Sequence, residues 1–276
     1  MKKTIGIILG IIMVLGVLGL SFFAGMKYAN HENGNEQKIN EKDSDLAPKE
    51  ELIKLDDKVV KDADSIIPRT ICHGYAIKFD KKNRSVKDIS DKEKLAMVIA
   101  YFGKDLSFDN VPDDEYDGEV SKEIKKSDIE KLFKDTSFLK ALEKEKDQFY
   151  GTGLYGMYIE NNKYYVNMVA TGCLAEEYSD DYIQLIKAEK RDGKLVLTYS
   201  YSYLTTKYNE KKDEFTYTLY RNKGDKTPVE RDVSVDEDGE FVVDWSRFHE
   251  YEFWFDTSED SMRLQEIRFR ETKNIE

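Results

Sequence analysis

The first hydrophobic feature of the chain is an apolar run from Thr4 to Met26 that contains no charged residue. As a helix, these 23 residues would rise about 34 Å, enough to span a bilayer core of about 30 Å. A cleaved signal peptide has a shorter apolar segment and small residues at positions −3 and −1, whereas cleavage after Ala24 or Ala29 would place Phe22 or Lys27 at −3. Residues 4–26 therefore predict an uncleaved transmembrane anchor, with cleavage as the alternative.

The charges beside this run predict its orientation. Lys2, Lys3 and the free amine precede it, and Lys27 follows it within a neutral-to-acidic stretch. The positive-inside bias then places the N-terminus in the cytoplasm. We expect a single-pass cell-membrane protein whose remaining chain is extracytoplasmic.

The next segment, residues 27–50, is rich in Asn, Glu and Lys and has almost no large apolar residues. Such a composition does not bury enough surface to offset the entropy of ordering, which is typical of a flexible linker. The sequence thus divides into an anchor (1–26), a linker (27–50) and one extracytoplasmic domain (51–276).

In the first part of that domain, apolar residues recur at helical spacing. The recurrence from Leu52 to Ile66 predicts a helix that ends before Pro68. Ser90 to Glu93 form a capping box that opens a helix ending near Gly103, and Ser127 to Glu130 form a second one.

From Gly153 onward the apolar period changes to two, which predicts antiparallel strands. Asn161-Asn162 and Asp192-Gly193 are turn pairs that tolerate positive φ and predict two hairpins. A two-residue turn at Asp192-Gly193 pairs residues whose numbers sum to 385. This register places Tyr182, Ile186 and Ala188 opposite Tyr203, Tyr199 and Leu197 on one aromatic face.

Helices followed by an antiparallel meander predict an α+β fold, with the N-terminal helices packed on the sheet. The order is similar to the cystatin-like cone of nuclear-transport-factor-like domains. Envelope assembly factors of conjugation and sporulation machines use that cone behind one membrane anchor. This similarity is an analogy of fold alone.

The layout also resembles uncharacterised membrane-anchored or secreted proteins of low-GC Gram-positive bacteria. The Lys2-Lys3 anchor, the Lys/Glu/Asn/Tyr-rich chain, the segment Ala170-Thr171-Gly172-Cys173 and the Asp192-Gly193 hairpin carry the resemblance. That group brings no established activity with it, so the resemblance implies location rather than chemistry.

The composition narrows the function further. The 14 Phe, 18 Tyr and 2 Trp residues supply a core and argue against whole-chain disorder. With 43 basic and 55 acidic residues the net charge is −12, which disfavours nucleic acid as a partner because phosphate backbones are bound by Lys and Arg.

One acidic segment has the alternation of a calcium loop. Asp113, Glu115 and Asp117 precede a Gly turn, and Glu119 follows it. Hard cations bind several oxygen ligands at such spacing, but the twelfth position, where a bidentate Glu belongs, is Ile124. We treat Asp113, Glu115, Asp117 and Glu119 as a candidate calcium site, with an ordinary solvated loop as the alternative.

Nucleophilic catalysis has little support in the sequence. There is no G-x-S-x-G motif, and the neighbours Cys72 and His73 would point to opposite faces of a strand. Outside the cell, Cys72 and Cys173 are candidates for a disulfide, and two unpaired thiols are the competing interpretation. The G-x-G-x-x-G at Gly151 has a helix before it and a strand after it, the reverse of the dinucleotide-binding context.

Tyr182, Tyr199, Tyr201 and Tyr203 are a candidate ligand platform, although aromatic residues at spacing two are also typical of a core face. We expect a non-enzymatic, membrane-tethered domain that binds an envelope protein or a small envelope ligand, with no cofactor. An envelope hydrolase with Asp and Glu carboxylates, or a calcium-responsive module, are the alternatives.

Overall fold

The computed structural model describes residues 50–69, 77–106, 120–145, 149–150, 155–168, 177–209, 213–237, 240–258 and 260–272. Nearly all of the expected anchor and linker lies outside these ranges. Within them, no helix is both long and apolar enough to cross a membrane.

The described residues form an α+β fold with two antiparallel sheets and few helices, as predicted at this level. The larger sheet has the strand order β1-β7-β8-β11-β12-β2, and β9 pairs with β8 and with β10. Its strands are β1 (Glu51–Leu52), β2 (Arg84–Ser85), β7 (Glu177–Arg191), β8 (Lys194–Asn209), β9 (Glu214–Tyr220), β10 (Glu230–Arg231), β11 (His249–Asp256) and β12 (Arg263–Arg270).

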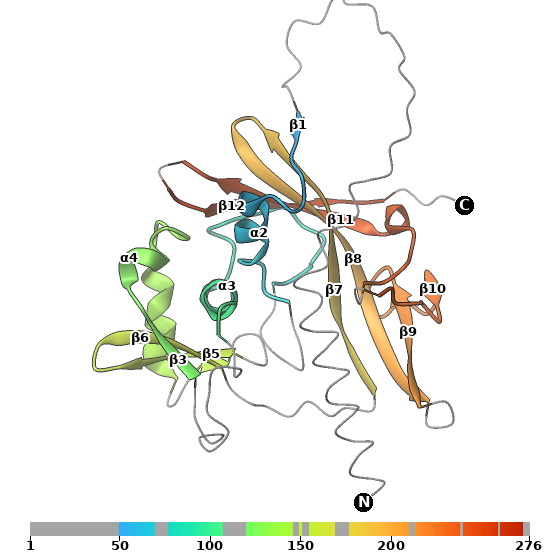
Figure 1. Cartoon of the computed structure of the whole chain (residues 1–276), viewed down its shortest axis with the longest axis horizontal. Helices are drawn as coiled ribbons and strands as arrows, with labels where there is room; N and C mark the ends of the chain where they lie inside the picture. Colours follow the sequence, from blue (N-terminus) through green and yellow to red (C-terminus); the bar gives the residue numbers. More distant parts are fainter. Residues whose placement is uncertain are drawn as a thin grey trace, which may run out of the picture.

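The smaller sheet lies to one side of the long β7–β8 hairpin, as Figure 1 shows. Its strand order is β3-β6-β5-β4. These strands are β3 (Val120–Ile124), β4 (Phe149–Tyr150), β5 (Tyr155–Glu160) and β6 (Lys163–Met168). The helical segments are α2 (Lys58–Asp64), α3 (Asp91–Gly103), α4 (Lys126–Ile129) and the 3₁₀ helices η4 (Ser137–Lys144) and η5 (Trp245–Arg247).

Both predicted hairpin turns are confirmed. Asn161 and Asn162 have φ of 50° and 62°, and Asp192 and Gly193 have φ of 51° and 74°. Two successive positive φ values match the right-handed twist of the flanking strands. Each turn therefore fixes the register of the strands that it joins, at least near the turn.

The first capping box is also confirmed. The Ser90 hydroxyl accepts the Glu93 amide at 3.3 Å, and Glu93 Oε2 accepts the Ser90 amide at 3.0 Å. Glu93 is 1% exposed, and its other oxygen accepts hydrogen bonds from Arg84 and the Lys78 amide, both at 2.8 Å. The cap thus joins the start of α3 to β2 and to the chain before it.

Helix α3 packs between the sheets and joins their cores. Leu95, Val98 and Ile99 are 0% exposed and belong to the same hydrophobic cluster as residues of both sheets. Gly103, the last residue of α3, has a packing reason for being Gly: a Cβ there would lie 3.0 Å from the Tyr155 ring. One continuous core therefore extends from the smaller sheet to the larger one.

Two predicted helix starts are wrong. Leu52 pairs with Glu189 in β1 rather than starting a helix, and α2 begins only after Asp57, whose side chain accepts the Val59 amide at 2.9 Å. The second capping box does not form, because β3 leads directly into α4 with Lys125 as its N-cap and no side-chain cap. After α4, the chain continues into η4, which starts at Ser137.

Candidate binding surface

A β-bulge in β7 decides where the four candidate platform tyrosines lie. From Arg191–Lys194 to Lys187–Thr198 the pairing is as predicted, but from Leu185–Tyr199 onward each partner is shifted by one residue. Side chains alternate between the two faces of a strand. A one-residue shift therefore moves the β7 side chains from Leu185 back towards the start of the strand to the other face. The single aromatic face predicted for Tyr182 and Tyr199 is therefore wrong.

Tyr199 and Tyr201 point into the main core. They are 0% and 4% exposed, and the Tyr199 hydroxyl donates to Asp64 Oδ1 at 2.6 Å. The Tyr201 hydroxyl donates to Asp181 at 2.7 Å, and burial is the main reason that both phenol pKa values are raised. Neither ring presents a face to a ligand in solution.

Tyr203 lies further along β8, near the surface. Its hydroxyl donates to Ser179 Oγ at 2.8 Å. The Lys223 ammonium lies 5.7 Å from the centre of its ring. This cation–π contact joins β8 to the loop after β9.

Tyr182 lies on the opposite face of the larger sheet, in a second apolar cluster. Its ring is stacked on Trp245 at 5.9 Å between centroids and meets Phe241 edge-on at 4.9 Å. Tyr217 of β9 adds a fourth half-buried ring, 5.1 Å from that of Phe241. We call this set the aromatic surface: Tyr182, Tyr217, Phe241 and Trp245.

The aromatic surface rests on buried apolar residues. Leu204, Leu219 and Phe248 are 5%, 0% and 1% exposed and lie beneath the rings. Val242, the residue between Phe241 and Val243 in the chain, is 56% exposed. Half-buried aromatic rings on a packed base are typical of binding surfaces, because they give large contact areas with little loss of side-chain freedom.

A carboxyl group stands at the edge of these rings. The Tyr182 hydroxyl lies 2.9 Å from Gln184 Oε1 and 3.2 Å from Glu240 Oε2. One hydroxyl proton serves one of these acceptors at a time, whereas a protonated Glu240 would donate to the Tyr182 oxygen and complete both contacts. Burial is the main reason that the pKa of Glu240 is raised, with the charge of Arg69 acting against it and the charge of Asp236 acting in the same direction.

Two fully buried carboxylates lie on the same face of the sheet, towards the β7–β8 turn. Glu189 and Glu252 are 0% and 1% exposed. Arg191 binds both of them, with 3.2 Å from its Nη1 to Glu252 Oε1. Lys187 lies 2.7 Å from Glu189, and Arg270 lies 2.5 Å from Glu252.

Trp254 is enclosed by the same group of charges. Its indole N–H donates to Glu252 Oε2 at 3.1 Å. The Arg268 and Arg191 guanidinium carbons lie 3.8 Å and 5.1 Å from its ring centre. We call this set the charged layer: Lys187, Glu189, Arg191, Glu252, Trp254, Arg268 and Arg270.

The remaining candidate residues lie outside the described ranges. They are the calcium-loop residues Asp113, Glu115, Asp117 and Glu119 and the disulfide candidates Cys72 and Cys173. Among the residues that the structure does describe, no group of three or more His, Cys, Asp or Glu side chains is placed to hold a metal ion.

Sequence reasoning missed most of the aromatic surface. Phe241 and Trp245 reach Tyr182 only because the segment after β10 folds back over β8 and β9. The alternation of apolar residues in Phe241 and Val243 was a signal for a strand, and the structure has only an isolated bridge there, between Val235 and Phe241. Nothing in the local pattern indicated which face that segment would cover.

Comparisons of the chain with protein-family models, with curated proteins and with solved structures found no match.

Proposed function

We propose that this chain is a membrane-tethered, extracytoplasmic domain that binds an envelope protein or a small envelope ligand and catalyses no reaction. The apolar run of residues 4–26 and the polar linker of residues 27–50 support the tether and its single-pass orientation. The aromatic surface is the observation that carries the binding role. A finer fold assignment, the cystatin-like cone, is part of this proposal and is supported by the long antiparallel β7–β8–β11 sheet with α2 packed against β8.

The aromatic surface suits a partner with apolar or sugar-like faces and at least one polar group. The rings of Tyr182, Phe241 and Trp245 offer contact area, and Glu240 offers a hydrogen bond at their edge. Binding sites combine such apolar area with a few placed polar groups.

Photo-crosslinking in intact cells tests this role. A photoreactive phenylalanine analogue would replace Val242, which follows Phe241 in the chain and is 56% exposed, and as a control Leu52, which is 72% exposed on β1. Neither position is in the core, so both variants should fold. We expect a discrete adduct from position 242 and none from position 52. Equal labelling at both positions, or no adduct at position 242, would contradict the proposal.

An envelope hydrolase is the second candidate, and one observation favours it. Glu240 has a raised pKa, as a general acid needs, and the Asp236 carboxylate lies beside it and accepts the Glu240 amide at 2.9 Å. Hydrolysis of purified cell-wall glycan by the full-length chain, lost in Glu240→Gln, would support this candidate and overturn the non-enzymatic proposal.

The calcium-responsive module stays a proposal with its own test. If the loop containing Asp113 and Asp117 binds calcium, the thermal midpoint of the full-length chain should rise with calcium and fall back with a chelator. The double variant Asp113→Asn/Asp117→Asn should show no rise. A midpoint that ignores calcium would exclude this module.

A further inference from the structure

The loop after β9 is basic although the protein as a whole is acidic. Within residues 221–228 there are three cations (Arg221, Lys223 and Lys226) and one carboxylate, Asp225. The net charge of the chain is −12, so an anion approaching most of the surface is repelled. A local group of cations is therefore the place where a small anion would be held.

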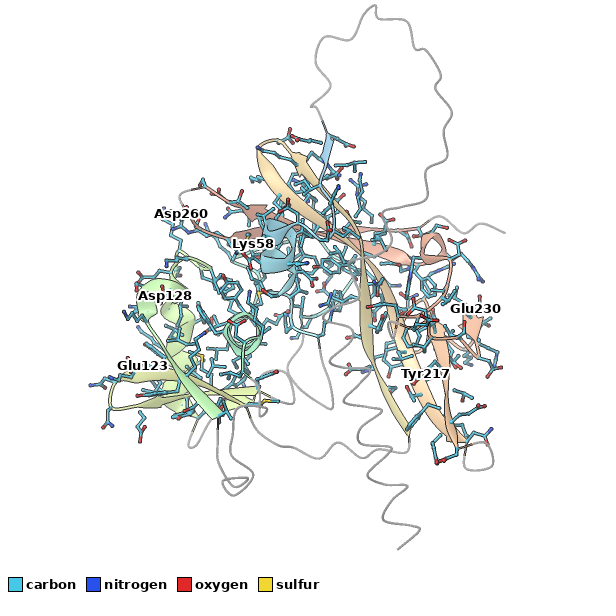
Figure 2. The ribbon with its side chains drawn as sticks, in the orientation of Figure 1. Lys58, Glu123, Asp128, Tyr217, Glu230 and Asp260 are labelled. Carbon is cyan, nitrogen blue, oxygen red and sulfur yellow. The ribbon has the colours of Figure 1, made fainter. Side chains whose placement is uncertain are left out.

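This loop borders a cavity of about 280 Å³. Two guanidinium groups line it, Arg221 just after β9 and Arg247 at the end of η5, together with the Asp225 carboxylate, Val229 and Thr272. Figure 2 shows Glu230 of β10 at this side of the molecule, far from Glu123 and Asp128 of the smaller-sheet side. The volume is at the small end of ligand pockets, which suits a compact group.

The guanidinium groups are held in place by the backbone. Arg247 Nη2 donates to the Val229 carbonyl at 2.7 Å, and Arg221 Nε donates to the Arg247 carbonyl at 3.2 Å. The one carboxylate of the loop is already engaged, because Asp225 accepts the Asn222 backbone and side-chain N–H groups at 2.9 and 3.0 Å. The positions of both arginines are thus fixed before a ligand arrives, which reduces the entropy lost on binding.

A buried histidine, His249, lies next to the cavity residue Thr272, and burial together with nearby positive charges lowers its pKa. His249 is 3% exposed, and its Nδ1 accepts the Thr272 amide at 3.2 Å. Burial and then the charges of Lys81 and Arg221 lower the pKa of His249, against the opposing charges of Glu271 and Asp225. The lowered pKa of His249 is thus consistent with the positive charge of Arg221 acting on this side of the cavity.

We propose that the cavity between Arg221 and Arg247 binds a small oxyanion, a phosphate or carboxylate group, through the two guanidinium forks. Arginine forks match the oxygen pairs of both groups. Glu230, which lies 2.6 Å from Arg247 Nη1, occupies one side of that fork and competes with the ligand. The site is separate from the aromatic surface, and the inference does not depend on the membrane tether.

The test uses the full-length chain in detergent, with inorganic phosphate and, separately, succinate as probes. Thermal midpoints are measured against anion concentration at constant ionic strength set with sodium chloride. We expect the thermal midpoint to rise and saturate with at least one probe. The probe that saturates at the lower concentration identifies which oxyanion the cavity prefers. No saturable rise with either probe would overturn the proposal.

Three variants locate the site. Arg221→Gln should weaken binding about tenfold, because one charge-assisted contact is lost. The control is Arg231→Gln, at an exposed position on β10. It changes the net charge by the same amount and should leave the affinity unchanged. Glu230→Gln removes the carboxylate charge paired with Arg247 Nη1 and should strengthen binding several-fold, an effect that damage to the fold would not produce. Equal affinities in the wild type and Arg221→Gln, or no gain in Glu230→Gln, would overturn the assignment.

Discussion

The two faces of strand β8 show how differently one sheet can be covered. On one face, Leu197, Tyr199 and Tyr201 pack against β11 residues such as Phe253 in the main core. On the other face, β8 lies beneath the charged layer near the β7–β8 turn and beneath the aromatic surface further along. The same strand thus supports the main apolar core on one face and, on the other, a charged layer beside a second apolar cluster.

The difference lies in how each face contributes to stability. Burial of apolar area stabilises the core face by about 25 cal/mol per Å². Buried ion pairs contribute little net stability, because desolvation offsets their attraction, but removal of one partner leaves a buried charge unpaired. The charged layer is therefore expected to be sensitive to single substitutions without being the main source of stability.

The largest effect should come from the core face. Phe253 is 0% exposed and packs 5.2 Å from the Tyr199 ring. Phe253→Ala should lower the free energy of unfolding by about 3–5 kcal/mol through lost burial and a cavity. Val242→Ala, at a position that is 56% exposed, is the control and should cost less than about 1 kcal/mol. Denaturant unfolding of the two variants measures both, and similar losses would contradict this account of the core.

A smaller effect is expected in the charged layer. Glu252 binds Arg191, Arg270 and the Trp254 indole. Glu252→Gln keeps the shape but removes the charge, and should cost about 2–3 kcal/mol.

The matched control on the same face is Glu266→Gln. Glu266 pairs with Arg268 at 2.5 Å, with side chains 31% and 41% exposed, so the loss should be below about 1 kcal/mol. Equal losses in Glu252→Gln and Glu266→Gln, measured by denaturant unfolding, would show that burial does not separate the two pairs.

The smallest effect is a difference in pH dependence between two glutamates. Burial raises the pKa of Glu240, so stability should fall as pH rises through that raised pKa, and Glu240→Gln should remove this fall. Burial acts in the same direction on Glu93, but hydrogen bonds from the Lys78 amide, Arg84 and Ser90 outweigh it and lower its pKa. Its contribution is therefore present above the ordinary Glu pKa and is lost as pH falls through the lowered one.

Unfolding curves from about pH 3 to pH 7 measure both differences. Relative to the wild type, Glu93→Gln should be less stable at neutral pH, and this deficit should shrink in acid. The Glu240→Gln difference should run in the opposite direction. Parallel curves for the two variants would contradict the assigned environments.

Local patterns predicted the parts of this fold that depend on neighbouring residues. The turns at Asn161-Asn162 and Asp192-Gly193 and the cap from Ser90 to Glu93 are encoded within a few positions, and the structure confirms them. The α+β class followed from the change of apolar period.

Long-range features were not predictable in the same way. The bulge after Leu185 shifts the register by one residue, and no turn residue marks it. It separates Tyr182 from Tyr199 and so decides the candidate site. The cover that Phe241 and Trp245 form over the sheet depends on tertiary packing, which a single sequence does not specify locally.

The central claim, a domain held outside the cytoplasm by residues 4–26, is tested most directly by protease treatment of intact cells. The full-length chain would carry an epitope tag after Glu276, with a cytoplasmic protein as the control for cell integrity. We predict that external protease removes the tag from intact cells while the control protein survives. A tag that is protected in intact cells but readily digested in lysates would contradict the account.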